Sequence, residues 1–396
     1  MQDAFVTSFD AEAIAARIKR QLPVNGRVAL HEPRFGDQEK ANVLDCVESG
    51  WVSYLGGYVD QFEQRIAALA GVAEGIATVN GTAALRVALQ GVGVTRNDEV
   101  LVPDFTFIAT LNAVCHLGAV PHLIDSERLT LGLCPDALEA RLEAIGRRGE
   151  VGTINIETGR HIKAVMPMHV FGHPARMDEI NEVAARWRLI VVEDAAQAIG
   201  SSYKGRPAGS LGRVAAFSFN GNKTVTTGGG GAIVTDDAEI AARIRHSITQ
   251  AKKPHQWAFV HDEIASNDRM PNLNAALGCG QLHRLDQILA SKRRVYKNYV
   301  TCLDGLDGIE VIIDPPECVG NHWLVSVLTP GPAERDALLQ AAHEVDILAR
   351  PAWATMHSMP MFADCPKGAL AVATDLVDRL VCLPSSPFLD PEWRDE

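Results

Sequence analysis

The sequence predicts an α/β fold, with a mainly parallel β-sheet in a large N-terminal domain and a smaller α+β domain after it. From about residue 75 to 237, short apolar runs alternate with helical periodicity, which is typical of a parallel sheet covered by helices on both faces. Beyond about residue 250, long helical patterns replace this alternation. A chain of 396 residues suggests two domains, and we expect them at 1–255 and 256–396.

The expected elements follow in a regular order. Residues 1–22 have the spacing of an amphipathic helix. We expect strands at 74–80, 99–105, 120–125, 162–170, 189–195, 214–220 and 231–237, with helices between them at 81–93, 108–118 and 177–188. In the C-terminal part we expect long helices over 272–303, short strands at 309–313 and 322–328, and a helix at 334–345.

Polar side chains stand where five of these strands end. Ligands of α/β proteins bind beyond the carboxyl ends of the strands, so we expect these residues near one edge of the sheet. They are Asn80, Asp104, His169, Asp194 and Asn220.

Composition limits the partners and the compartment. The formal net charge of −12 disfavours nucleic acid and anionic membranes, because both attract basic surfaces. The eight cysteines form no C-x-x-C pair, as expected of reduced thiols. The N-terminus lacks the apolar core of a signal peptide, and no segment reaches the roughly 18 apolar residues of a membrane span. We expect a cytoplasmic enzyme.

The strand at 189–195 carries an acid to the ligand-binding edge. It ends in Glu193 and Asp194. An acid there can keep a pyridine nitrogen protonated, which makes the ring of pyridoxal phosphate an electron acceptor. The alternative is a helix N-cap, since Asp favours that position and AAQAIG follows. Gln197 could hydrogen-bond the ring hydroxyl of the same cofactor.

A lysine follows the neighbouring strand end. The strand at 214–220 leads through Asn220-Gly221-Asn222 to Lys223, and four glycines stand at 228–231. A lysine in this place can form a Schiff base with a carbonyl cofactor, and burial would lower its pKa and free the amine. The glycines are not followed by the Lys and Ser or Thr of a Walker loop, and they suit a tight turn or a close backbone approach.

A phosphate site and a ring-stacking residue would complete such a cofactor site. Gly81, Thr82 and Ala83 open a helix directly after a strand, where free N–H groups and the helix dipole attract anions. Ser218 could add a second hydroxyl, and Phe107 could stack on the pyridine ring. Each residue is also common as a cap or core residue, so the prediction depends on their combination.

Two other kinds of site fit the sequence less well. His169 and His173 have the i, i+4 spacing of a metal site, but Gly172 and Pro174 interrupt any helix and no H-E-x-x-H acid is present. We therefore expect no metal. No G-x-G-x-x-G follows the first strand, which disfavours a dinucleotide-binding oxidoreductase.

Six motifs follow one another along the chain: NGTAAL, PDFTFIAT, GHPARMD, VVEDAAQAIGSSYKGRPAGSLG, FSFNGNKTVTTGGGGAIVTDD and RMPNLNAALG. In this order they resemble the DegT/DnrJ/StrS family of sugar aminotransferases, over roughly Val28 to Pro384. The resemblance implies fold type I of the pyridoxal-phosphate enzymes and a homodimer with sites at the subunit boundary. It also implies amino transfer from L-glutamate to the C4 keto group of a nucleotide-linked sugar, with pyridoxamine phosphate formed in between.

The same resemblance assigns roles to individual residues. Lys223 would form the Schiff base and move protons, and Asp194 would pair with the pyridine nitrogen. Gln197 would lie near the ring hydroxyl and Phe107 on the ring, while Asn267 would reach the phosphate of the neighbouring subunit's cofactor. The implied phosphate ligands are Gly81, Thr82, Ala83 and Ser218.

Three motifs narrow the substrate. HEPRFG, SGWVS and FNGNK resemble the subgroup that aminates UDP-4-keto-6-deoxy-N-acetylhexosamines on the legionaminic acid and bacillosamine routes to bacterial surface glycans. Many relatives have His-Pro before the lysine and Gly-Glu-Gly-Gly after it, where this chain differs, so a dTDP- or GDP-linked keto sugar is the alternative. Relatives that dehydrate sugars carry histidine at the lysine position, so Lys223 favours transamination. A cofactor-holding sensor without turnover is disfavoured, because every catalytic position is present.

Candidate substrate residues come from three segments. The loop that resembles a substrate-facing segment contains Trp51, Ser53 and Tyr54. The candidates for the diphosphate or the donor carboxylate are Lys252, Lys253 and Arg269, with a solvated surface as the alternative for the two lysines. From the small domain, His322 and Trp323 could approach the sugar.

Overall fold

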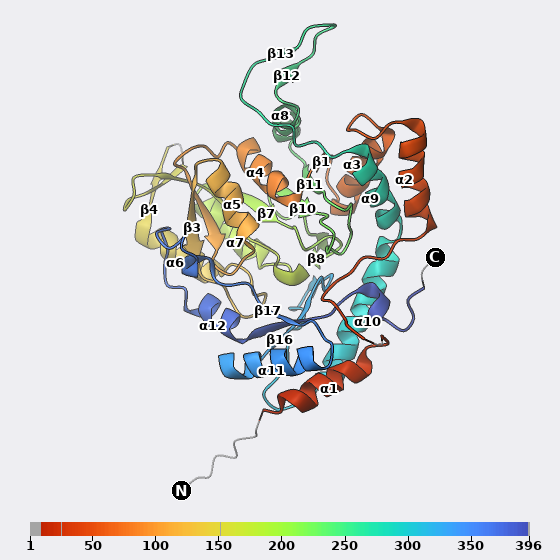
Figure 1. Ribbon diagram of the computed structural model, residues 1–396. Coiled ribbons are helices and arrows are strands. Elements are labelled where there is room, and N and C mark those ends of the chain that lie inside the picture. The colour runs from red at the N-terminus through yellow and green to blue at the C-terminus, as the bar shows by residue number, and fades with distance from the viewer. Residues whose placement is uncertain (1–8, 25, 151, 395–396) are drawn as a thin grey trace.

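The computed structural model describes residues 9–24, 26–150 and 152–394 (Figure 1). The first eight residues of the helix expected at 1–22 lie outside the described residues. Helix α1 (Ala11–Gln21) begins after Asp10, whose side chain accepts a hydrogen bond from the Ala13 N–H and so caps the helix.

A central sheet has the spatial order β1-β11-β10-β7-β6-β2-β3. Neighbouring strands pair in parallel from β10 through β7, β6 and β2 to β3, and β11 runs antiparallel to both β10 and β1. The predicted mainly parallel sheet is therefore confirmed. The strands are β1 (Glu74–Thr78), β2 (Glu99–Pro103), β3 (Val120–Ile124), β6 (His161–Val165), β7 (Ile190–Asp194), β10 (Val214–Ser218) and β11 (Gly231–Thr235), and the hairpin β4 (Gly146–Gly149) and β5 (Gly152–Asn155) pairs with β6.

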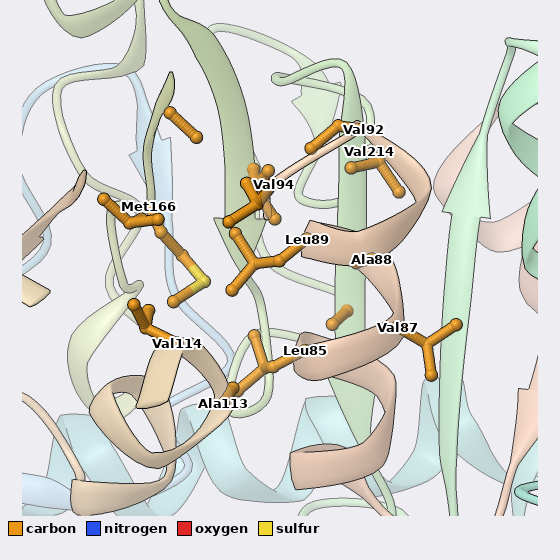
Figure 2. Close-up of a cluster of buried hydrophobic side chains, with 14 of the residues drawn as sticks. Leu85, Val87, Ala88, Leu89, Val92, Val94, Ala113, Val114, Met166 and Val214 are labelled. Carbon is orange, nitrogen blue, oxygen red and sulfur yellow. The ribbon is translucent and has the colours of Figure 1, made fainter. Parts of the chain in front are cut away.

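Helices cover both faces of this sheet because successive strand residues point to opposite sides. Figure 2 shows Leu85 and Leu89 of α4 directed toward Val114 of α5 and Met166 beyond β6, all fully or almost fully buried. Burying each such side chain contributes roughly 1.5–3 kcal/mol. The covering helices are α4 (Gly81–Gly91), α5 (Ile108–His116) and α8 (Ala238–Ile248) on this face, and α3 (Gly57–Ala70), α6 (Pro135–Ile145), α7 (Met177–Arg186) and α9 (Asn272–His283) on the other.

A smaller antiparallel sheet lies in the C-terminal part, with the order β14-β16-β18-β17. Ile14 and Ile18 of α1 pack with Val295 and Leu338 in its core, so the N-terminal helix lies against C-terminal elements (Figure 1). The elements are β14 (Glu310–Val311), β16 (Val325–Leu328), β17 (Arg350–Pro351), β18 (Leu380–Leu383), α10 (Leu285–Leu303), α11 (Pro332–Glu344) and α12 (Ala371–Arg379).

The division predicted at residue 255 stays a prediction. Helix α9, which follows that position, packs on α2 (Asp37–Ser49) and α3 in the core of the larger part. The remaining elements are β8 (Ser202–Tyr203), β9 (Arg206–Pro207), β12 (Lys252–Lys253), β13 (Val260–His261), β15 (Cys318–Val319), η1 (Val170–Gly172), η2 (Met356–Ser358) and η3 (Pro387–Leu389). The hairpin of β12 and β13 projects from the body at the top of Figure 1. Among the helices of the described residues, none has the length and apolar content needed to cross a bilayer.

Candidate active site

The strand ends and the start of α4 enclose a cavity of about 150 Å³. We call it the cofactor cavity. Seven of the residues predicted to bind the cofactor line it together, which are Gly81, Thr82, Phe107, Asp194, Gln197, Ser218 and Lys223. Ala83 and Asn267, also predicted, are not among its lining residues. The rest of the wall is Asn80, Leu85, Ala109, Met168, Ala196 and Asn220.

Asp194 ends β7 as a buried carboxylate. Oδ2 accepts a hydrogen bond from Thr110 Oγ1 at 2.7 Å, and Oδ1 accepts one from the Ala196 N–H at 3.2 Å. Burial raises the pKa of this carboxyl, although both hydrogen bonds and the Lys223 charge oppose the rise. The residues after it form turns rather than a helix, so the alternative helix N-cap is wrong. A cationic ring N–H would be a further positive partner for this carboxylate.

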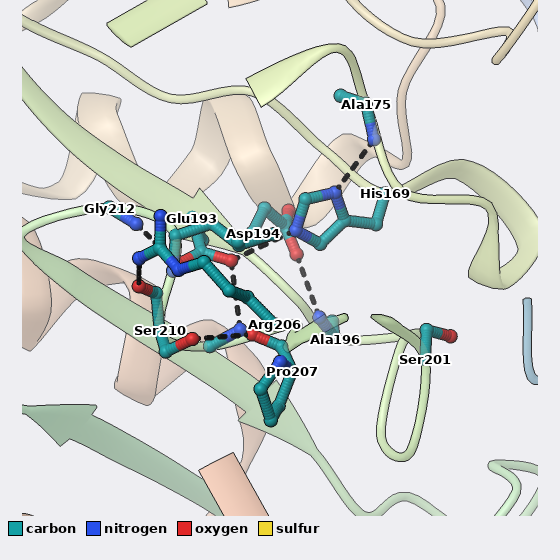
Figure 3. A network of polar contacts seen from close by, with 12 residues as sticks. His169, Ala175, Glu193, Asp194, Ala196, Ser201, Arg206, Pro207, Ser210 and Gly212 are labelled. Atoms are coloured by element: carbon teal, nitrogen blue, oxygen red, sulfur yellow. Dashed lines mark hydrogen bonds and ion pairs between the residues drawn. The ribbon is translucent and has the colours of Figure 1, made fainter. Parts of the chain in front are cut away.

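The preceding residue is fixed by a network of polar contacts (Figure 3). Glu193 accepts hydrogen bonds from the N–H groups of Gly209, Leu211 and Gly212 at 2.6–2.8 Å. His169 Nδ1 accepts from the Ala175 N–H at 3.1 Å, so the ring proton lies on Nε2, which donates to Glu193 at 3.0 Å. Both nitrogens of His169 are engaged, and its role is to hold the end of β7 in place.

Lys223 lies next to Asp194 in the cofactor cavity, after the turn that follows β10. Its Nζ is 4.0 Å from the ring centroid of Trp323, which comes from the C-terminal part of the chain. Loss of solvation lowers the pKa of Lys223 to about 8, against the opposing effect of Asp194. A substantial fraction of the amine is therefore neutral near pH 8 and able to act as a nucleophile.

The start of α4 provides an anion site. A Cβ at Gly81 would lie 2.6 Å from Ser218 Cβ, so glycine is needed for α4 to approach β10 this closely. In the described part of the chain, the hydroxyls of Thr82 and Ser218 have no hydrogen-bond partner and are free for a ligand. The Ala83 N–H donates to Asn80 Oδ1 at 2.8 Å, so the cap occupies this group.

Phe107 and Gln197 form further parts of the wall. The Phe107 ring is half-exposed and lies 5.6 Å from the ring of Trp353. The buried Gln197 accepts from the Phe171 N–H at 2.8 Å through Oε1, which leaves its amide N–H groups as donors. An acid, an amine, an anion site and an aromatic wall thus surround one cavity, and these residues fit pyridoxal phosphate.

Five predicted substrate or cofactor residues lie outside the cavity, around the loop between α2 and α3. Trp51 and Ser53 are exposed there, and Tyr54 lies beneath Arg269, whose guanidinium carbon is 3.2 Å from the Tyr54 ring centroid. Asn267 is exposed and accepts from Arg269 at 3.0 and 3.2 Å.

The two lysines predicted for the diphosphate or the donor carboxylate lie on the projecting hairpin. Lys252 is exposed over the Phe259 ring at 4.5 Å, and Lys253 pairs with Asp262 at 3.2 Å. Neither residue lines the cofactor cavity.

His322 is buried away from the cofactor cavity. It stacks on Tyr296 with a ring separation of 3.9 Å, and burial lowers its pKa to about 3. Its Nε2 lies 3.4 Å from Asp314, which also hydrogen-bonds His173 Nδ1 at 3.0 Å. The three side chains could hold a metal ion by proximity, but they also satisfy one another as a histidine–aspartate cluster.

Several residues of this region have no role predicted from the sequence. Thr110, which anchors Asp194, carries no signal of its own beyond helical spacing. Trp353 contacts Phe107 from a distant part of the chain. His31, in the HEPRFG motif, is buried near Lys223 and was not assigned a role.

The model of the DegT/DnrJ/EryC1/StrS aminotransferase family matches residues 33–396. Among curated proteins, a GDP-perosamine synthase of Caulobacter vibrioides is 38% identical over 353 residues, which cover 88% of this chain and 90% of that protein. A GDP-perosamine synthase of Escherichia coli O157:H7 is 34% identical over 365 residues, covering 92% and 95%.

A solved structure, DesI in the presence of its TDP-sugar product, superposes with a TM-score of 0.80 at 29% identity and covers 92% of this chain and 89% of that one. The predicted fold type I is confirmed by such neighbours. The chain therefore belongs to the DegT/DnrJ/EryC1/StrS aminotransferase family and is a pyridoxal-phosphate-dependent sugar aminotransferase.

Proposed function

We propose that the enzyme transfers an amino group from L-glutamate to the C4 keto group of a UDP-linked 4-keto-6-deoxy-N-acetylamino sugar, for a bacterial surface glycan. The observation that supports amino transfer most directly is that Lys223 and Asp194 line the same cavity at the start of α4. The motifs HEPRFG, SGWVS and FNGNK support the UDP-linked substrate.

A GDP-linked keto sugar is the second candidate. The specific observation that favours it is 38% identity, over most of both chains, to a GDP-perosamine synthase. The cofactor cavity itself does not discriminate the two, because its lining residues surround the cofactor rather than a nucleotide.

A few side chains of the cofactor cavity would perform the steps of amino transfer. When bound, pyridoxal phosphate supplies a ring that accepts electrons from a carbon losing a proton. Lys223 would hold the cofactor through its Nζ. When free, the same amine would take a proton from the α-carbon of the donor and would later deliver one to the sugar carbon. Asp194 keeps the ring nitrogen protonated, and the start of α4 with Thr82 and Ser218 holds the phosphate.

A homodimer completes the proposed site. Asn267, Trp51 and Ser53 are exposed outside their own cofactor cavity, where they are available to a neighbouring subunit. The projecting hairpin carries Trp257, Phe259 and Ile264, which are 77%, 81% and 99% exposed. Apolar side chains this exposed favour packing against a second copy of the chain.

The test is an assay of the purified holoenzyme with glutamate and a panel of UDP-, GDP- and dTDP-linked 4-keto sugars. Release of one 2-oxoglutarate per aminated sugar, fastest with the UDP-linked N-acetylamino sugar, is the expected result. Preference for the GDP-linked sugar would favour the second candidate. Sugar dehydration without 2-oxoglutarate release, or no turnover with any sugar, would contradict both.

A further inference from the structure

A second cavity, of about 530 Å³, adjoins the cofactor cavity on the side of the smaller sheet. Its wall joins three distant segments: the stretch before α2 (Ala29, Leu30, His31), the lysine turn (Asn222), and C-terminal residues that include Trp323, Arg350 and Trp353. We call it the donor pocket.

Two tryptophans and the lysine turn form the partition between the cavities. Trp323 Nε1 donates to the Asn222 carbonyl at 2.7 Å, while Lys223 Nζ lies 4.0 Å from the same indole ring. Trp353, which lines the donor pocket, contacts Phe107, which lines the cofactor cavity. A ligand in the donor pocket would therefore contact Asn222, the residue before Lys223, and Trp323, the indole that covers the Lys223 amine.

His31 is a buried donor and acceptor without a partner. The side chain is 7% exposed, and neither ring nitrogen has a hydrogen-bond partner among the described residues, although the Asn222 backbone lies close by. Burial and the nearby charges of Lys292 and Lys223 lower its pKa well below the usual range, so the ring is neutral. An unpaired buried imidazole costs stability unless a ligand pairs with it.

The charge of the pocket favours an anion. No residue of its wall, all of which lies within the described chain, is acidic. The backbone of Arg350 pairs with β18, but its exposed side chain has no ion pair or hydrogen bond in the described part of the structure. A guanidinium without a partner at a cavity wall is suited to a carboxylate, which it binds through two parallel hydrogen bonds.

The remaining wall favours a dicarboxylate over a sugar. Leu30, Leu324, Leu348 and Pro351 are apolar, and Arg350, His31 and Asn222 are the few polar side chains. A hexose would leave several hydroxyls unpaired against this wall. In a dicarboxylate, the short methylene chain would pack against the apolar wall of the pocket. One of its two carboxylates would then face the guanidinium of Arg350.

We propose that the donor pocket binds the amino donor as a dicarboxylate, with Arg350 pairing with its distal carboxylate and His31 hydrogen-bonding the ligand. The assignment rests on the proposed aminotransferase function and names its donor site. It makes Arg350 the residue that distinguishes glutamate from an amino acid without a second carboxylate.

The first experiment follows the half-reaction of the holoenzyme with glutamate, without any sugar, through the visible absorbance of the cofactor. For Arg350→Gln, the half-saturating glutamate concentration is expected to rise about 10- to 100-fold, as for loss of a charged hydrogen-bonded pair, with alanine as donor unchanged. Arg20→Gln, an exposed arginine of α1, is the matched control. An unchanged ratio of glutamate to alanine reactivity would overturn the assignment.

The second experiment needs no turnover. Glutarate titrated into the apoenzyme is expected to change the tryptophan fluorescence saturably, since Trp323 and Trp353 line the pocket. The change should persist in Arg20→Gln, weaken in Arg350→Lys and His31→Leu, and disappear in Arg350→Gln. Equal binding in all variants would overturn the proposal, and Arg350→Lys serves if Arg350→Gln does not fold.

The sugar substrate is the competing occupant. A rise in the half-saturating concentration of the keto sugar nucleotide in Arg350→Gln, with glutamate unaffected, would assign the pocket to the sugar and overturn the proposal. Failure of wild-type enzyme with every sugar would count against the proposed function only, because the glutamate and glutarate measurements still decide the donor pocket.

Discussion

At the scale of single residues, the chemistry depends on the mutual influence of Lys223 and Asp194. Desolvation lowers the pKa of the amine to about 8 and raises that of the carboxyl, while each group's charge opposes the shift of the other. Trp323 covers the amine and limits its contact with water. The lysine is therefore reactive at a pH where an exposed lysine, with a pKa near 10.4, is almost wholly protonated.

The first prediction concerns the pH dependence of cofactor capture. Below pH 8 most of the Lys223 amine carries a proton, so the rate of pyridoxal-phosphate capture by the apoenzyme should rise with pH and level off above about 8. Asp194→Asn removes a charge that favours the protonated amine, so the plateau should begin at lower pH. Stopped-flow absorbance measures both profiles, with the exposed Lys252→Gln as control. A wild-type midpoint near 10.5 would contradict this environment for Lys223.

At the scale of elements, the phosphate site depends on how closely α4 approaches β10. Gly81 and Ser218 are in contact there, and Asn80 caps the helix through the Ala83 N–H. The cap directs the N-terminal end of α4 into the cofactor cavity, where its dipole favours an anion.

The second prediction tests this contact. Gly81→Ala would place a Cβ 2.6 Å from Ser218 Cβ and push the helix away from the strand. We expect a loss of about 1–3 kcal/mol in the free energy of unfolding and weaker cofactor binding, measured by denaturant unfolding and by titration with pyridoxal phosphate. Gly57→Ala is the control, since Gly57 also begins a helix but has no atom within 4 Å of an added Cβ. Equal effects of the two substitutions would rule out the close approach of α4 to β10 as the cause of the lost stability and the weaker cofactor binding.

Much of the fold and part of the site could be predicted from the sequence at this scale. Each buried strand is a continuous apolar run, and the polar residue that ends it lies at the ligand edge, as for Asp194 and Asn220. The turn after Asp194 was harder to predict, because the composition of AAQAIG is typical of a helix, whereas the observed backbone forms turns. Likewise the side chain of Asn80, not a ligand, takes the Ala83 N–H.

At the scale of the whole molecule, the pocket beside Lys223 is assembled from both ends of the chain. His31, Trp323 and Arg350 meet because α1 and the stretch after it lie against the C-terminal elements. No local pattern encodes such contacts, which explains why His31 and Arg350 received no role from the sequence. The stacking of His322 on Tyr296 is likewise absent from the sequence pattern, and the approach of His322 to the sugar stays a prediction.

The third prediction concerns assembly. Replacing Trp257, Phe259 and Ile264 of the hairpin by serine removes the exposed apolar surface that we propose packs on a second copy. We expect the dimer to dissociate at concentrations where the wild type does not, in analytical ultracentrifugation, while each monomer keeps its circular dichroism spectrum. Replacing the exposed Ile156 by serine offers a comparison surface away from both the hairpin and the loop around Tyr54. An unchanged dimer in the triple variant would show that the hairpin does not contribute to the dimer interface.

The most direct measurement of the central claim locates the lysine that holds the cofactor. The holoenzyme is reduced with borohydride, digested, and its peptides analysed by mass spectrometry for the pyridoxyl adduct. We expect the adduct on Lys223 and its loss in Lys223→Ala. Lys292 is the sharpest internal comparison, because it too is buried with a lowered pKa but donates to Ser385 and Trp323 away from the cofactor cavity. An adduct on Lys292, or on no lysine, would contradict the account.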